Sequence, residues 1–211
     1  MRNILFVGAH HDDLELSIGG SVKRWSSEGK KVCGAFLTSS EWKKPDGQIQ
    51  RSFDVASKHC TNAAQILGYK PFHLKAARDF ELRYDDAIVV KLLNIIQDEQ
   101  IDTLVTLWPH DAHPTHQIAS RIALAATRKV PNVLTARVSW NSVVEAFKPN
   151  FFVDITAQYE TKLKALRCYE DEFARTGALW EKFVRGSATV YGLEANCEYA
   201  EAFEIVKLRY S

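Results

Sequence analysis

Histidine and aspartate residues are concentrated in two short segments of this 211-residue chain. Residues 9–15 read AHHDDLE, and residues 108–116 read WPHDAHPTH. Imidazole nitrogens combined with one carboxylate suit Zn²⁺, whereas Mg²⁺ and Ca²⁺ prefer mostly oxygen ligands. Fe²⁺ also accepts two histidines and one carboxylate. These residue types therefore predict a Zn²⁺ site, with Fe²⁺ as the alternative ion.

Three of these side chains are expected to hold the ion, and two to act on a substrate. We take His10, Asp13 and His116 as the ligands, although spacing by itself does not separate Asp13 from Asp12. Three protein ligands leave a position for water, as in catalytic zinc sites, where the pKa of that water falls to about 7. Asp12 is then the expected general base. His113, one helical turn before His116, is the expected donor to the oxyanion or to the leaving amine.

The same residues also have ordinary structural explanations. A single histidine is more often a surface or core residue than a ligand, and adjacent aspartates commonly cap a helix. Neither explanation accounts for two such clusters, each placed directly after a buried strand. His59 and His73 lie outside both clusters, and we expect them to have no role in the site.

The order of predicted elements explains how the two segments meet. Short apolar runs predict strands, and apolar residues at helical spacing predict the helices between them. The strands are expected at 3–9, 31–37, 71–75 and 102–107, and the helices at 14–28, 50–67, 85–100 and 114–128. This alternation predicts an α/β fold, a Rossmann-like, doubly wound, mostly parallel sheet flanked by helices. In the strand order 3-2-1-4-5, strands one and four are neighbours at the switch point, where such sheets bind ligands.

The last third of the sequence has a different pattern. We expect short strands at 133–140, 143–147 and 151–153, helices at 156–172 and 179–185, and a final strand at 203–208. These elements form a C-terminal α+β extension. Because no Pro/Gly/Ser-rich linker precedes them, residues 1–211 are predicted to form a single domain.

Composition argues against several other functions. The 27 basic and 26 acidic residues give a net charge of +1, so we expect no nucleic-acid partner. The apolar run at the N-terminus is too short for a signal peptide or a membrane span, and the four cysteines form no Cys-x-x-Cys pair. We therefore expect a cytoplasmic protein with reduced thiols and no membrane partner.

Two other kinds of site are disfavoured by the motifs. No G-x-G-x-x-G follows the first strand, which argues against a dinucleotide site. Two-metal phosphoesterases need bridging carboxylates, and this chain has ligands for one ion only.

Four segments carry a family resemblance that extends over most of the chain. Residues 9–16 with Gly19 and Gly20 resemble the A-H-P-D-D-x-E signature of the PIG-L (LmbE-like) N-acetylglucosaminyl deacetylase family, and residues 113–116 resemble its H-P-D-H signature. Thr38 ends the second strand as in the family. Residues 152–156, followed by Lys162 and Tyr169, look like its V-D-I-T…K…Y stretch, and residues 199–203 resemble the Y-A-E-x-F of the bacillithiol-pathway branch.

The resemblance implies a zinc-dependent hydrolase that removes an acyl group, acetyl in the family, from the nitrogen of an amino-sugar-containing small molecule. It implies His10, Asp13 and His116 as zinc ligands, Asp12 as general base, and His113 as the oxyanion or acid residue. It also makes a homo-oligomer possible. N-acetylglucosaminyl-malate, a sugar nucleotide, an antibiotic amino sugar and an acetylated oligosaccharide all remain candidate substrates.

Two departures from the family signatures bear on activity. His11 replaces the usual proline, so it either stiffens the loop less or contacts substrate. Thr115 replaces an aspartate that would support the neighbouring histidine, which should lower the pKa of His113 unless Asp111 takes over. The alternative function is therefore a catalytically weakened member that binds metal and sugar without efficient turnover.

Substrate contacts are predicted at two basic residues. Arg51 is the candidate for the basic residue that follows the second strand in the family, and Arg78, together with Asp79, is a further candidate.

Overall fold

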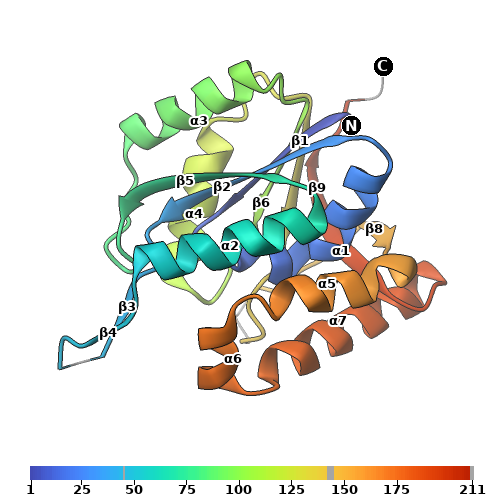
Figure 1. The fold of residues 1–211 in the computed structure, drawn as a ribbon. Coiled ribbons are helices and arrows are strands. Elements are labelled where there is room, and N and C mark those ends of the chain that lie inside the picture. The colour runs from blue at the N-terminus through green and yellow to red at the C-terminus, as the bar shows by residue number, and fades with distance from the viewer. Residues whose placement is uncertain (45, 142–144, 210–211) are drawn as a thin grey trace.

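A seven-stranded sheet forms the centre of the computed structural model, which describes residues 1–211 except 45, 142–144 and 210–211 (Figure 1). The strand order is β5-β2-β1-β6-β7-β9-β8. The strands are β1 (Asn3–Gly8), β2 (Lys31–Thr38), β5 (Lys70–Ala77), β6 (Thr103–Leu107), β7 (Asn132–Ala136), β8 (Phe151–Asp154) and β9 (Ala200–Lys207). The first five are parallel, and β9 runs antiparallel to both β7 and β8. The predicted order 3-2-1-4-5 is confirmed, with β9 and β8 added at one edge; only β9 runs against the parallel strands.

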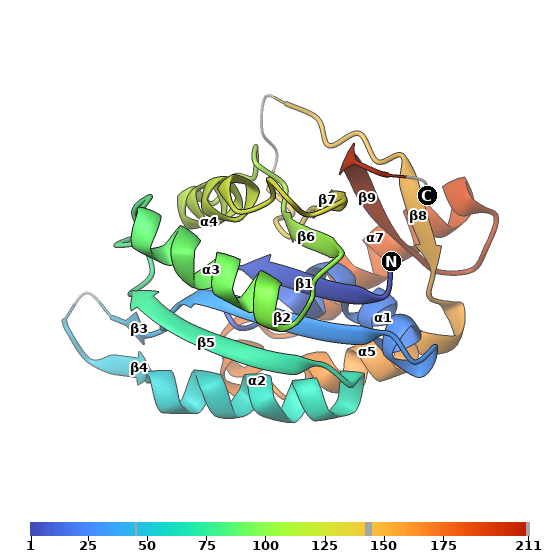
Figure 2. The same ribbon diagram turned by 90° about the horizontal axis from the view of Figure 1, so that it is seen from above.

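Helices cover both faces of this sheet, as Figures 1 and 2 show. On one face lie α1 (Asp13–Ser27), α2 (Phe53–Leu67) and α5 (Tyr159–Leu166), and on the other α3 (Asp86–Asp98) and α4 (Pro114–Ala125). The chain continues through α6 (Glu170–Thr176) into α7 (Leu179–Ala195), which packs against β8 and β9. The predicted α/β fold with a C-terminal α+β extension is therefore confirmed.

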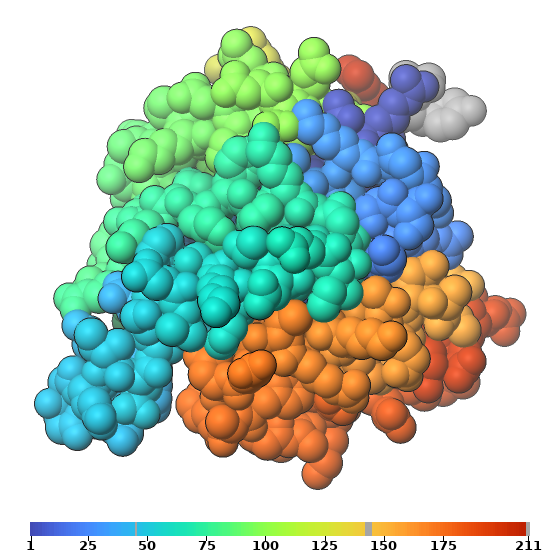
Figure 3. Space-filling view, viewed as in Figure 1, coloured from blue at the N-terminus to red at the C-terminus, as the bar shows by residue number. Residues whose placement is uncertain are grey.

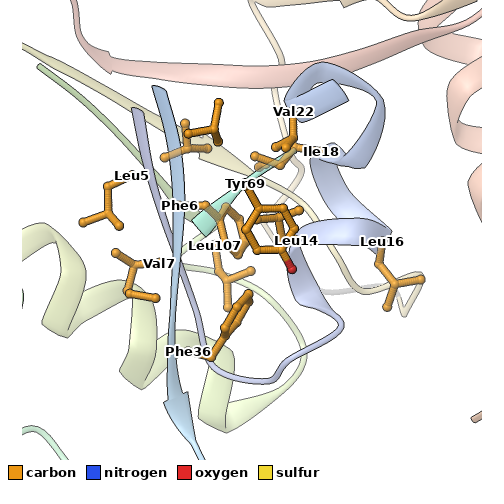
Figure 4. Packing of buried hydrophobic residues seen from close by; sticks show 14 of the residues in the cluster. Leu5, Phe6, Val7, Leu14, Leu16, Ile18, Val22, Phe36, Tyr69 and Leu107 are labelled. Carbon is orange, nitrogen blue, oxygen red and sulfur yellow. The ribbon is translucent and has the colours of Figure 1, made fainter. Parts of the chain in front are cut away.

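The central strand β1 has a continuous apolar sequence because both of its faces are covered. Side chains alternate along a strand, so Leu5 and Val7 point to one side of β1 and Phe6 to the other, toward Leu107 and Tyr69 (Figure 4). Each of these three β1 side chains is fully buried, which contributes about 1.5–3 kcal/mol per residue. This packing fixes the strand end from which the first histidine cluster departs.

Several element boundaries differ from those expected. The helix predicted from residue 50 begins at Phe53, because residues 49–51 form β4 (Ile49–Arg51), which pairs with β3 (Trp42–Lys43). Ser52 instead caps the helix, its hydroxyl accepting from the Val55 amide. The β3–β4 hairpin, which the sequence patterns did not reveal, projects from the body of the molecule (Figure 3).

The C-terminal boundaries differ more. The helix predicted over 156–172 is divided into η1 (Thr156–Gln158), α5 and α6, and the helix predicted over 179–185 extends to Ala195. Of the strand predicted at 143–147, residues 143–144 lie outside the described residues, and 145–147 form no strand. In the described part of the chain, no helix combines the length and apolar character needed to cross a bilayer.

Candidate metal centre

Two loops at the carboxyl edge of the sheet bring the histidine clusters together. β1 ends at Gly8 and leads into α1 at Asp13, and β6 ends at Leu107 and leads into α4 at Pro114. β1 and β6 are directly hydrogen-bonded neighbours. Pro114 occupies the first turn of α4, where the missing N–H has no cost. The crossovers leave β1 and β6 in opposite directions, so this is the topological switch point.

Three side-chain atoms from these loops converge on one small volume. His10 Nδ1 lies 3.1 Å from His116 Nε2, His116 Nε2 lies 3.2 Å from Asp13 Oδ1, and His10 Nδ1 lies 3.6 Å from Asp13 Oδ1. In a tetrahedral zinc site with bonds of about 2.0–2.1 Å, neighbouring ligand atoms lie about 3.3 Å apart. The separations between the two nitrogens and the oxygen are therefore close to those of a tetrahedral zinc site.

A further polar group lies behind each of these three side chains: a carboxylate behind each histidine, and backbone amides behind Asp13. Asp111 Oδ1 lies 3.1 Å from His116 Nδ1. Asp79 Oδ1 lies 2.9 Å from His10 Nε2. This second contact is an ion pair, because the N–H of the His10 ring is poorly aligned with the oxygen. Asp13 Oδ2 accepts from the amides of Ala9 and His10 at 2.7 and 2.8 Å. Metal-binding histidines usually carry such a carboxylate on the other ring nitrogen, which fixes the tautomer and the ring orientation.

The electrostatics of the cluster favour a cation. Burial opposes charge on both histidines, but Asp13 and Asp111 outweigh it and raise the pKa of His116 to about 9. Interactions with Asp13 and Asp79 likewise raise the pKa of His10 well above its ordinary value. Burial alone would raise the pKa of Asp13, yet His116 and His10 hold it well below its ordinary value. Protons and a metal ion would compete for the same lone pairs, so binding of an ion here depends on pH.

Asp12 and His113 border a cavity that opens in front of these three side chains. Burial raises the pKa of Asp12 to about 6, against the opposing effect of Arg51. His113 Nδ1 accepts from the amide of Thr115 at 3.2 Å, so the neutral ring carries its proton on Nε2. Burial, together with His116 and His10, lowers the pKa of His113. The cavity is therefore bordered by a carboxylate with a raised pKa and by a neutral ring N–H group.

His113 is also close enough to be considered a ligand. Two overlapping groups place possible ligand atoms within 4.8 Å of one another, namely His10 with His113 and His116, and His10 with Asp12 and Asp13. Because His113 Nδ1 is occupied by the cap of α4, only Nε2 could bind, and it would first have to lose its proton. The geometry thus favours His113 as a donor.

The two predicted substrate residues have different surroundings. Arg51 lines the cavity, which has a volume of about 430 Å³, and lies 3.5 Å from Asp12 Oδ2. Arg78 does not line it and pairs with the exposed Glu81. Asp79, considered beside Arg78 from the sequence, does line the cavity. The substrate roles of both arginines stay predictions.

The two departures from the family signatures are explained by their contacts. The His11 side chain is fully buried and does not line the cavity, and it lies 2.7 Å from Ser40 Oγ and 2.8 Å from His73 Nδ1. Burial lowers its pKa to about 3. Thr115 donates to Asp79 Oδ1 at 2.8 Å, and Asp79 Oδ2 lies 3.9 Å from His113 Nε2. A carboxylate thus faces His113, but Asp79 supplies it, since the side chain of Asp111 is turned to His116.

The C-terminal extension holds the first loop and α1 in place. The Tyr169 hydroxyl lies 2.6 Å from the His11 carbonyl oxygen and 3.0 Å from Glu15 Oε2. Lys162 donates to Glu201 Oε1 at 2.6 Å and to the Leu16 carbonyl at 3.0 Å. These residues belong to the late motifs noted in the sequence, and their contacts give them a positioning role.

Several cavity residues escaped the sequence patterns. They come from the hairpin, from the loop after β7 and from α6, namely Trp42, Trp140, Glu172 and Arg175. Asp79 had a usable signal, because it follows β5 at the same carboxyl edge of the sheet as the two histidine clusters. Of the two histidines set aside, His59 pairs with Asp171 and His73 with His11, and neither lines the cavity.

Comparison with known proteins gives consistent similarities. The family model PIG-L, described as GlcNAc-PI de-N-acetylase, matches residues 5–127. The chain is 29% identical to the diacetylchitobiose deacetylase of Thermococcus kodakarensis, and the match covers 98% of this chain and 84% of the relative. It is 30% identical to an uncharacterized deacetylase of Escherichia coli, and that match covers 79% of this chain and 89% of the relative. The solved structure of N,N'-diacetylchitobiose deacetylase from Pyrococcus horikoshii superposes with a TM-score of 0.83 at 25% identity, covering 97% of this chain and 84% of that one.

Proposed function

The chain belongs to the PIG-L family, and from this we propose that it is a zinc-dependent hydrolase that removes an N-acyl group, acetyl in the simplest case, from an amino-sugar-containing small molecule. Named relatives with similar sequences are deacetylases. One observation carries the proposal: His10 Nδ1, Asp13 Oδ1 and His116 Nε2 converge beside the cavity that Asp12 and His113 also border.

The donor set fits the proposed ion. Two imidazole nitrogens and one carboxylate oxygen are typical of catalytic Zn²⁺, and each has a partner that fixes its orientation. When bound, the ion supplies Lewis-acid activation of water and of the amide carbonyl. Fe²⁺ accepts the same donors, so zinc is the part of the proposal that needs direct measurement.

Asp12 is proposed to take the proton from the attacking water. With a pKa raised to about 6 by burial, its carboxylate is ionised at neutral pH and yet basic enough to accept a proton. The C–O bond forms, the C–N bond breaks, and the same proton passes to the departing nitrogen. The new carboxyl group releases the second proton of the water, which the amine takes up, so the products are a carboxylate, acetate for an acetyl group, and the protonated amine.

His113 is proposed to stabilise the oxyanion. Its Nε2–H faces the cavity, and the cap of α4 fixes the tautomer. A preorganised donor of this kind typically contributes about 10²–10³ in rate. Because Asp79 provides a carboxylate near this ring, the Thr115 replacement does not leave His113 without one. This contact favours turnover over the alternative of a binding-only protein.

The remaining parts of the proposal concern substrate and setting. An N-acetylated saccharide is the proposed substrate class, since the Thermococcus relative is named for deacetylation of diacetylchitobiose. Arg51, in the wall of the cavity, is the proposed contact to this substrate. We propose a cytoplasmic location, which fits four free cysteines. A homo-oligomer stays a prediction from the family resemblance.

Amine release from N,N'-diacetylchitobiose tests the function. Purified protein should release one free amine per acetate, lose activity when treated with a chelator, and regain it with Zn²⁺. Metal content is measured by elemental analysis. Asp12→Asn should keep bound zinc and lose at least about 10²-fold in kcat, whereas the exposed Asp98→Asn serves as a control with the same change of charge.

Two results would refute parts of this scheme. Full activity of Asp12→Asn would exclude Asp12 as the base. Protein that holds zinc but releases no amine from any N-acetylated sugar would support the binding-only alternative.

A further inference from the structure

Glu172, on α6, lies in the wall of the proposed substrate cavity and is engaged by two arginines. Its Oε1 lies 3.0 Å from Arg51 Nη2, and its Oε2 accepts from Arg175 Nε at 3.0 Å and also contacts the Nη2 of that residue. The Glu172 side chain is only 7% exposed. A carboxylate buried this far normally requires such paired cations.

Arg51 has almost no remaining capacity to bind an anion. Besides Glu172, its guanidinium contacts Asp12 Oδ2 and Asp171 Oδ2, both at 3.5 Å, and Nε donates to the carbonyl of Ser40 at 3.0 Å. The side chain is 8% exposed. Three carboxylates surround this one guanidinium, so an incoming carboxylate or phosphate would have to displace Glu172 from a buried ion pair, which is costly.

The charges around the cavity are negative in sum. Among the described lining residues, five are acidic and two are arginines, which leaves three negative charges while the lining histidines are neutral, or one after a divalent ion binds to neutral histidines. The acidic residues are Asp12, Asp13, Glu41, Asp79 and Glu172, and the basic ones are Arg51 and Arg175. Both arginines are held by Glu172. Glu172 therefore offsets the charge of both arginines, including Arg175, whose side chain is 51% exposed, and an anionic group on the substrate would meet a net repulsive field.

The remaining wall suits the apolar face of a sugar ring. Trp42, Phe80 and Trp140 line the cavity and are 40%, 63% and 46% exposed. Exposed aromatic rings that border a cavity commonly mark a binding surface. Phe80 stacks on His113, with ring centroids 5.1 Å apart, so this aromatic rim (Trp42, Phe80 and Trp140) begins next to the proposed oxyanion donor.

We infer that the site accepts an uncharged N-acetylated saccharide that extends onto the aromatic rim, and that Glu172 is the residue that selects against conjugates carrying a carboxylate or phosphate beside the sugar. This inference rests on the proposed deacetylase function. It adds a substrate class and a specificity-determining residue outside the metal and catalytic groups.

Two matched substrates test the inference. The methyl glycoside of N-acetylglucosamine and N-acetylglucosamine 1-phosphate differ mainly in charge at one position. The zinc-loaded protein should have a kcat/KM at least about tenfold higher for the methyl glycoside. Glu172→Gln, which removes the carboxylate charge shared by both arginines, should shift that ratio toward the phosphate by about tenfold. Glu170→Gln removes the same charge from an exposed position on the same helix and should leave the ratio unchanged.

The outcomes separate this inference from the function on which it rests. Equal or better turnover of the phosphate by the wild-type protein overturns the inference while supporting deacetylation. An unchanged ratio in a folded Glu172→Gln protein, checked by thermal melting, overturns the assignment of Glu172.

A calorimetric measurement covers the case without turnover. If neither these two sugars nor N,N'-diacetylchitobiose is deacetylated, the proposed function fails, and titration of both sugars into the zinc-loaded protein still decides the charge preference. Tighter binding of the methyl glycoside supports the inference, whereas equal or tighter binding of the phosphate overturns it. The wild-type measurements suffice for this decision if Glu172→Gln does not fold.

Discussion

Replacing Asp79 by asparagine should weaken zinc binding without removing a proposed ligand. Asp79 Oδ1 lies 2.9 Å from His10 Nε2 and accepts from the Thr115 hydroxyl and the Phe80 amide, both of which an amide oxygen can also satisfy. Asparagine therefore keeps the local geometry and removes one charge. Polar contacts to charged groups contribute about 1.5–3 kcal/mol, and contacts between neutral groups contribute about 0.5–1.5 kcal/mol. The free energy of zinc binding should therefore weaken by about 1–1.5 kcal/mol in the asparagine variant. That corresponds to about tenfold in the dissociation constant.

Competition against a chromophoric zinc chelator at pH 7.5 measures this effect. Asp79→Ala also removes the acceptor and should approach about 100-fold, the upper range for outer partners of metal-binding histidines. Asp98→Asn is the matched control. Wild-type affinity in both Asp79 variants would refute the idea that this carboxylate supports His10 as a ligand.

Two further predictions concern pH. Thr115→Asp places a second carboxylate near His113 and should raise the pKa of this histidine. The limb of the pH–rate profile governed by His113 should then move to higher pH. An unaltered profile would contradict the assignment of that limb to His113. Burial raises the pKa of Glu15 to about 8 in the folded protein, against 4.5 as the reference value. The folded state then retains a proton that the unfolded chain releases, so the free energy of unfolding should fall between about pH 4.5 and 8. In urea unfolding, Glu15→Gln should gain stability relative to the wild type from pH 5 to pH 8, and an equal difference at both pH values would argue against this shift.

The core of the fold was predictable from local patterns. Strands β1 and β6 are buried on both faces, so their sequences are mostly apolar, with two threonines in β6, and the helices between them bury one stripe at helical spacing. These two signals depend only on neighbours along the chain. Together with the handedness of parallel crossovers, they place the loops at residues 9–13 and 108–113 side by side.

Other boundaries depended on contacts that local patterns do not reveal. The hairpin at residues 42–51 has exposed strands with little apolar alternation, and the first residues of the helix predicted there belong to it. The helix predicted over 156–172 is divided in three, although its apolar residues keep a helical spacing. Tyr169, at the break before α6, directs its hydroxyl to Glu15 and to the His11 carbonyl rather than to solvent.

The sequence by itself determined which residue types meet at the switch point, because strand order and strand ends follow from the pattern of apolar residues. Only the tertiary structure decided the partners of those residues. Asp79 reaches His10 from the loop after β5, and Glu172 reaches Arg51 from α6, and each of these pairs is far apart along the chain. Their roles follow from distances of 3–4 Å between side chains, and no periodicity in the sequence encodes which of several buried carboxylates lies that close.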